Sequence, residues 1–192
     1  MPDMPTREGA LALLREFNQA DRAIRHALAV EAAMRYFARK AGQSEGLWGV
    51  VGLIHDLDYE QFPDQHCRKT AEILRQRNWP EEVVRAAESH GWGICSQVEP
   101  LSRMEKTLFA IDELTGLVSA TALVRPSKSV MDMTAKSVRK KWKEKQFAAG
   151  VSREVIEKGA AMLGVDLSDL IADTILGMRE AAGELGLAGQ PE

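Results

Sequence analysis

Apolar residues recur along this chain at intervals of three and four, which is the spacing of one face of an α-helix. Strict alternation of apolar and polar residues, the pattern of a half-buried strand, is absent. The longest helical pattern follows Pro100 and continues to Val124. The pattern therefore predicts an all-α fold, a helical bundle in a single domain.

Capping and breaking residues divide this pattern into about eight helices. Thr6, Asp21, Ser44 and Ser152 each stand before an apolar-periodic segment and can cap it. Pro80 is followed by two glutamates, a combination that favours a helix start. We expect helices at about residues 6–17, 21–41, 44–55, 65–77, 80–90 and 100–124, and two more that start at 152 and at 167–169 and end near 183.

With 192 residues the chain is long enough to bury one sizeable core. We expect a first helix within residues 1–20, a core domain over 21–125 and a helical extension over 126–187 that packs on the core. Residues 188–192 have the composition of a frayed tail.

Composition narrows the class of protein. The hydrophobic fraction of 45% and charged fraction of 28% are ordinary for a soluble globular protein. A net charge of −3 gives no drive toward nucleic acid or an anionic membrane, and no apolar run approaches the ~20 residues that span a bilayer. Two cysteines are too few for a disulfide framework. We therefore expect a reduced, cytoplasmic protein without membrane or nucleic-acid partners.

An apolar run over residues 47–54 ends abruptly in the dyad His55-Asp56. Asp58 and Tyr59 follow within three residues of the dyad. Two strong metal ligands at the end of a buried segment indicate a site at the edge of the core. On the dyad alone, a helix end with a solvated histidine and aspartate is an equally good interpretation.

The other histidines are distributed over the neighbouring predicted helices. His26 lies within the second helix, His66 at the start of the fourth and His90 at the end of the fifth. Asp112 lies beside the apolar stripe of the sixth helix, where a carboxylate is costly unless it is paired or bound to metal. Taken singly, each histidine also has a structural explanation, such as a boundary residue, a solvated first-turn residue or a C-terminal cation.

The order of these residues resembles the H…HD…D signature of the HD-domain superfamily of metal-dependent phosphohydrolases, over about residues 20–125. With two further histidines in between, it is similar to the H…HD…H…H…D pattern of members with two metal ions. The resemblance implies six ligands, which are His26, His55, Asp56, His66, His90 and Asp112. The chain departs from many members at Asp58, where they have a glycine or a lysine-containing stretch, and no Gly-Tyr-Pro follows the dyad.

The resemblance also implies a function. Imidazole and carboxylate donors suit Mn, Fe, Co, Ni or Zn, so one or two such ions would be the cofactor. They would activate water to cleave a phosphomonoester or phosphoanhydride, with a nucleotide as the expected small-molecule substrate. Asp56 would bridge the two ions. Because Asp58 and Glu60 lie close to the dyad in the sequence, we expect one of them to orient the water or accept a proton. A non-catalytic HD module that binds a nucleotide or a partner protein is the main alternative, and a di-iron oxygenase is a weaker one. Each of these functions is compatible with a homo-oligomer.

Substrate contacts are less well defined by the sequence. Arg125 and Lys128 can bind phosphates, and Trp92 between two glycines can stack on a base. The competing interpretation of the basic residues, including the segment 136–145, is a solvated basic face. The competing interpretation of Trp92 is a packed tryptophan at the end of a helix.

Cys67 and Cys95 flank two of the histidines, but their spacing is not that of common zinc modules, so we expect small buried residues.

Overall fold

The computed structural model describes residues 5–189, and every regular element in that range is helical. Within these residues the β-type pairings are two isolated bridges, Trp92 with Ser96 and Ser129 with Ala188. The predicted all-α class is therefore confirmed. The helices are α1 (Arg7–Phe17), α2 (Asp21–Lys40), α3 (Glu45–Ile54), α4 (Arg68–Gln76), α5 (Glu81–Ser89), α6 (Arg103–Leu123), α7 (Ala135–Trp142), α8 (Arg153–Leu163) and α9 (Leu167–Glu180), with a 3-10 turn at Pro63–Gln65.

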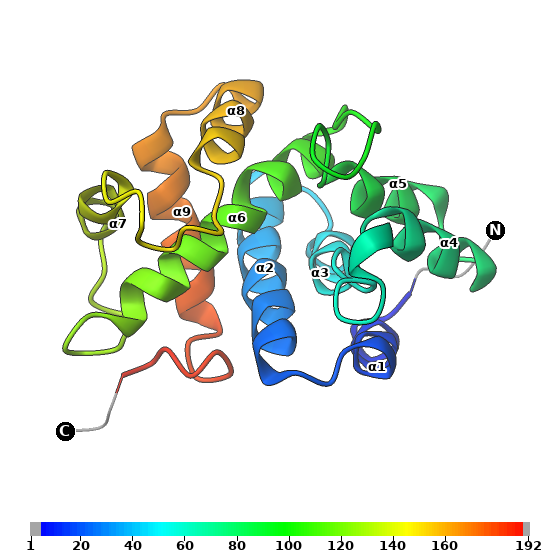
Figure 1. The fold of residues 1–192 in the computed structure, drawn as a ribbon, viewed down its shortest axis with the longest axis horizontal. Coiled ribbons are helices and arrows are strands. Elements are labelled where there is room, and N and C mark those ends of the chain that lie inside the picture. Colours follow the sequence, from blue (N-terminus) through cyan, green and yellow to red (C-terminus); the bar gives the residue numbers. More distant parts are fainter. Residues whose placement is uncertain (1–4, 190–192) are drawn as a thin grey trace.

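Helices α2 and α6 pack against each other near the centre of the molecule (Figure 1). Helices α1, α3, α4 and α5 lie on one side of this pair, and α7, α8 and α9 lie on the other. The two sides share one continuous hydrophobic core, which includes Leu14 of α1, Val51 of α3, Leu114 of α6 and Ile175 of α9. The C-terminal helices thus pack against the helices that precede them.

Two glycines allow α3 to approach α2 closely. A Cβ at Gly52 would lie 2.8 Å from the Cα of Glu31, and one at Gly49 would lie 2.9 Å from Cγ of Arg35. Later residues of α3 thus face earlier residues of α2, so the two helices are antiparallel. One further turn in the same register brings the end of α3 level with His26 of α2.

Glycines also mediate the packing of the C-terminal helices. A Cβ at Gly159 of α8 would lie 2.5 Å from the Cα of Ala110 in α6. A Cβ at Gly177 of α9 would lie 2.8 Å from the Cα of Ala33 in α2. Both central helices therefore have a second close neighbour, and α8 is fixed along the same part of α6 that precedes Asp112.

Several predicted helix boundaries are confirmed. Thr6, Ser44 and Ser152 are N-caps, and each side chain accepts a hydrogen bond from a backbone N–H of the first turn. Asp21 is the first residue of α2 rather than its cap. The prediction that Pro100 starts the sixth helix was wrong, because Ser102 and Glu105 form a capping box that starts α6 at Arg103.

Two other differences concern the function. The basic segment contains α7, a helix that the apolar pattern did not predict because Val138 is its only fully buried residue. Helix α4 begins at Arg68, so His66 lies just before the helix and not within it.

Of the predicted tail, residues 190–192 lie outside the described range. Among residues 5–189, no helix has the length and apolar character needed to cross a membrane.

Candidate metal centre

The dyad lies where α3 ends, and two other helices bring donors close to it. His55 is the C-cap residue of α3, and Asp56 begins the turn that follows. His26 comes from α2 and Asp112 from α6, the two central helices. Their donor atoms all lie within 4.8 Å of one another.

The first group of donors surrounds one oxygen of Asp56. His26 Nε2 lies 2.9 Å from Asp112 Oδ1, and His55 Nε2 lies 3.2 Å from the same oxygen. The two imidazole Nε2 atoms are 3.3 Å apart. Both lie 3.5 Å from Asp56 Oδ2.

The second group surrounds the other oxygen of the same carboxylate. Asp56 Oδ1 lies 3.4 Å from His66 Nε2 and 3.2 Å from His90 Nε2. These two nitrogens are 3.3 Å apart. Asp56 is therefore common to two groups of donors, which together form the donor cluster of His26, His55, Asp56, His66, His90 and Asp112.

These separations fit the ligands of a divalent metal ion. With metal–ligand bonds of about 2.0–2.2 Å, neighbouring ligands stand about 2.9 Å apart at a right angle and about 3.4 Å apart at a tetrahedral angle. The imidazole–carboxylate and imidazole–imidazole separations within each group span 2.9 to 3.5 Å. Nitrogen and carboxylate oxygen are also the donor types that first-row transition ions accept. The residues present thus fit the ions that the sequence predicts.

The opposite ring nitrogens fix the orientation of three histidines. His55 Nδ1 lies 2.8 Å from the carbonyl oxygen of Gly52, and His90 Nδ1 lies 2.5 Å from that of Ala87. His66 Nδ1 lies 2.7 Å from Asp58 Oδ1. Each Nδ1–H donates to its oxygen, which leaves the Nε2 lone pair directed into the donor cluster. Metal-binding histidines in proteins are held in the same way.

The electrostatics of the donor cluster favour positive charge at its centre. Burial alone lowers the pKa of His26 and His55, but the carboxylates of Asp112 and Asp56 outweigh it and raise both pKa values. Burial would raise the pKa of Asp112, yet His55 and His26 hold it well below its usual value. The carboxylates therefore stay ionised and attract cationic charge, which protons or a divalent ion can supply.

One side of the donor cluster is closed and the other is open. The His55 and His90 side chains are 0% and 3% exposed, while those of His26 and Asp56 are 27% and 23% exposed. Tyr59, which is largely exposed, lies edge-on to His66 with 5.0 Å between ring centroids. A substrate can therefore approach from the side of His26 and Asp56.

Asp58 does not have the geometry of a water-orienting residue. It is fully buried behind His66, and its Oδ2 accepts a hydrogen bond from the Thr70 backbone N–H at 2.7 Å. Both oxygens are thus occupied, one by His66 and one by Thr70. Glu60 is also engaged elsewhere, because its Oε2 accepts the backbone N–H groups of Gln19 and Ala20. These contacts give no support to the predicted catalytic role of Asp58, and they place its carboxylate where it orients His66.

The structure does not bring Arg125 and Lys128 to the donor cluster. Arg125 follows the end of α6, thirteen residues beyond Asp112, which is about 20 Å at the helical rise. Its guanidinium pairs with Asp132 at 2.6 Å. Lys128 lies in the turn after it, at a φ of 47°.

Trp92 lies near the donor cluster together with a lysine that the sequence did not indicate. Lys158 of α8 places its Nζ 3.5 Å from the centroid of the half-buried Trp92 ring. The ring centroids of Trp92 and Phe109 are 6.0 Å apart. Trp92 follows His90 by two residues, and Phe109 precedes Asp112 by about one helical turn. Lys158 therefore brings a positive charge to the α6 face that carries Asp112.

The two cysteines meet behind the second group of donors. Their Sγ atoms are 2.7 Å apart, and Cys67 Sγ lies 4.0 Å from His90 Nε2. Cys67 is fully buried, as predicted, whereas Cys95 is exposed. The neighbouring thiol lowers the pKa of Cys95 to about 6 and raises that of Cys67.

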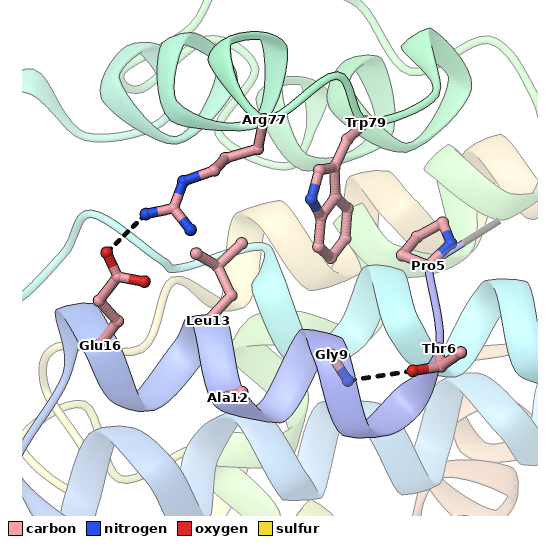
Figure 2. A pocket seen from close by; sticks show the side chains of 8 residues that line it. All are labelled: Pro5, Thr6, Gly9, Ala12, Leu13, Glu16, Arg77 and Trp79. Carbon is pink, nitrogen blue, oxygen red and sulfur yellow. Dashed lines mark hydrogen bonds and ion pairs between the residues drawn. The ribbon is translucent and has the colours of Figure 1, made fainter. Parts of the chain in front are cut away.

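The two hollows described on the surface lie away from the donor cluster. The larger, of about 310 Å³, lies between α1 and the segment that links α4 to α5, where Arg77 pairs with Glu16 and Trp79 stands over Gly9 (Figure 2). The smaller, of about 230 Å³, lies between Leu28 of α2 and Ala181 after α9. Neither contains a residue of the donor cluster.

Comparison with protein-family models matches residues 23–117 to the HD domain. The matched range runs from the start of α2 into α6 and contains every member of the donor cluster. Comparisons with curated proteins and with solved structures give no significant match.

Proposed function

Through residues 23–117 this chain belongs to the HD-domain family, and we propose on that premise that it is a phosphohydrolase that uses divalent metal ions. The observation that carries the proposal is the Asp56 carboxylate. Each of its oxygens lies within 3.5 Å of two imidazole nitrogens. A carboxylate in this arrangement is suited to bridge two ions.

The geometry suggests how the ligands are shared. His26, His55, Asp112 and Asp56 Oδ2 would hold one ion, and His66, His90 and Asp56 Oδ1 would hold the other. Mn, Fe, Co, Ni and Zn all accept this set of donors. Bound ions of this kind supply charge to stabilise a phosphoryl group and lower the pKa of water.

The chain's own residues hold the geometry that such chemistry needs. Gly52 and Ala87 present backbone carbonyls that fix His55 and His90, and Asp58 fixes His66. The closed side, formed by His55 and His90, excludes bulk water from the back of the donor cluster. Asp56 and Asp112 remain ionised because the adjacent imidazoles hold their pKa values low. The open side is left for the substrate.

Three residues near the donor cluster favour a phosphorylated substrate, with a nucleotide as the preferred class. Lys158 provides a cation for a phosphate that the donor cluster does not reach. Tyr59 and Trp92 provide aromatic surfaces on which a base can stack, although Lys158 covers one face of Trp92. Arg125 and Lys128 are not part of this proposal, because the geometry gives them no support.

A hydrolysis screen tests the proposal. The purified protein is incubated with nucleoside mono-, di- and triphosphates and generic phosphoesters in the presence of Mn, Co, Ni, Fe or Zn, and phosphate release is measured. We expect turnover that chelation abolishes and that is absent from the double variant H55A/D56A. Binding of metal and nucleotide without turnover would instead favour a non-catalytic HD module. An air-dependent product with oxidised iron would favour an oxygenase.

A further inference from the structure

The two cysteines of the chain form a contact that the proposed hydrolase does not require. Cys67 and Cys95 are separated by 27 residues, yet their Sγ atoms approach to 2.7 Å. A disulfide bond needs a sulfur separation of about 2.0 Å, so a shift of less than about 1 Å would close it. Both are free thiols in this structure.

The local backbone is shaped around this contact. A Cβ at Gly91 would lie 2.2 Å from Cys95 Sγ and 2.4 Å from Cys67 Sγ, so the two sulfurs occupy the space that any other residue at position 91 would fill. Cys67 has a φ of 67°, which is unfavourable for a residue with a side chain. The tight turn after His90 returns Cys95 to this place, with the Cys95 N–H donating to the Gly91 carbonyl at 3.0 Å.

One of the two sulfurs is accessible from outside. Cys95 lies in an exposed stretch with Gly93 and Ile94, while Cys67 is fully buried behind it. A small disulfide can therefore reach Cys95, and Cys67 can reach only Cys95. This is the arrangement of an attacking thiol with a resolving thiol.

We propose that Cys67 and Cys95 are a reversible disulfide site, oxidised by thiol–disulfide exchange with a low-molecular-weight disulfide such as glutathione disulfide. The Cys95 thiolate attacks one sulfur of glutathione disulfide, which forms a mixed disulfide and releases one glutathione. Cys67 Sγ then attacks Cys95 Sγ, which forms the intramolecular S–S bond and releases the second glutathione. The protein loses two electrons and two protons, and these reduce one glutathione disulfide to two molecules of glutathione.

The bond would join the two segments that carry His66 and His90. Cys67 follows His66 directly, and Cys95 closes the turn that begins after His90. Oxidation would therefore link covalently the two segments that hold His66 and His90, the histidines of the second group of donors. The proposal does not rest on hydrolase activity, because it concerns only the sulfurs and the backbone that holds them.

Thiol trapping and mass spectrometry test this site. The protein, with whatever metal it carries, is equilibrated with mixtures of reduced and oxidised glutathione, quenched with iodoacetamide under denaturing conditions and analysed intact. We expect both thiols to disappear together. The oxidised protein should be two hydrogens lighter than the reduced protein before alkylation, and a peptide containing Cys67 should be cross-linked to one containing Cys95. Closing this loop should also raise the melting temperature by about 10 °C.

The matched control is C95S, which changes an exposed residue and leaves the buried Cys67 in place. It should acquire no cross-link, no glutathione adduct and no rise in melting temperature. Two results would overturn the proposal. One is a stable glutathione adduct on Cys95 while Cys67 remains free. The other is a pair of free thiols at glutathione ratios that fully oxidise a reference dithiol such as thioredoxin.

Discussion

Asp58 Oδ1 lies 2.7 Å from His66 Nδ1, so a fully buried carboxylate supports the histidine whose other nitrogen faces Asp56. Thr70 completes the arrangement, because its backbone N–H donates to Asp58 Oδ2 and its hydroxyl accepts from the Asp58 N–H. The carboxylate thus fixes both the orientation and the tautomer of His66. This contact distinguishes the second group of donors from the first.

The substitution Asp58→Asn should weaken binding of one ion and spare the other. An amide oxygen still accepts from His66 but lacks the negative charge that makes the imidazole a stronger ligand, and losses of such partners cost about 10- to 100-fold in metal affinity. Isothermal titration calorimetry with Co²⁺ or Mn²⁺ would resolve the two binding events. The control is Asp64→Asn, an exposed carboxylate of the neighbouring 3-10 turn. Equal effects of the two substitutions would exclude the proposed role of Asp58.

The substitution Gly52→Ala should destabilise the protein and disturb the donor cluster. The added Cβ would meet the backbone of Glu31 at 2.8 Å, which forces α3 away from α2. Overpacking of this kind costs about 2 kcal/mol, which exceeds the ~1 kcal/mol that alanine gains over glycine within a helix. We expect a melting temperature lower by a few degrees and weaker metal binding.

Gly46 offers a control for this change within the same helix. A Cβ at Gly46 would meet only Ser44 Oγ, at 3.9 Å. Gly46→Ala should therefore leave the melting temperature unchanged or slightly higher. Thermal melts of the two variants would decide the point, and a Gly52→Ala variant as stable as Gly46→Ala would show that α2 and α3 do not need their close approach.

The substitution Lys158→Met should raise KM for a phosphorylated substrate without changing metal content. It removes a cation beside Trp92 but keeps most of the aliphatic stem, and a charged hydrogen bond is worth about 1.5–3 kcal/mol, so kcat/KM should fall by about 10- to 100-fold. Lys128→Met is the control, since Lys128 lies beyond the far end of α6. A larger loss in Lys128→Met than in Lys158→Met would restore the original interpretation of the basic residues after α6.

Much of the fold could be predicted because its signals are local. The three-and-four spacing of apolar residues predicts the long helices, and Thr6, Ser44 and Ser152 predict where three of them begin. Helix α7 lacked such a signal because one buried residue leaves no apolar face. The start of α6 was misplaced because Pro100 is conspicuous in the sequence, whereas Ser102 acts through a capping box.

The donor cluster was predictable in composition but not in its supporting contacts. The order of His26, the dyad and Asp112 carries a family resemblance, and the family match includes all of them. The support of His66 by Asp58 depends on how the chain turns after α3. Lys158 reaches the same region only because Gly159 packs on Ala110, a contact between residues far apart in the chain. The spacing of residues within a short stretch of sequence does not predict contacts between such distant segments.

If Asp56 is shared by two metal ions, the metal content of the protein will show it. Equilibrium dialysis against Mn²⁺ or Co²⁺, followed by elemental analysis, would count the ions bound to the wild type and to H66A under anaerobic conditions. We expect two ions per chain in the wild type and one in H66A. A wild type that binds a single ion, or an H66A variant that keeps both, would contradict it.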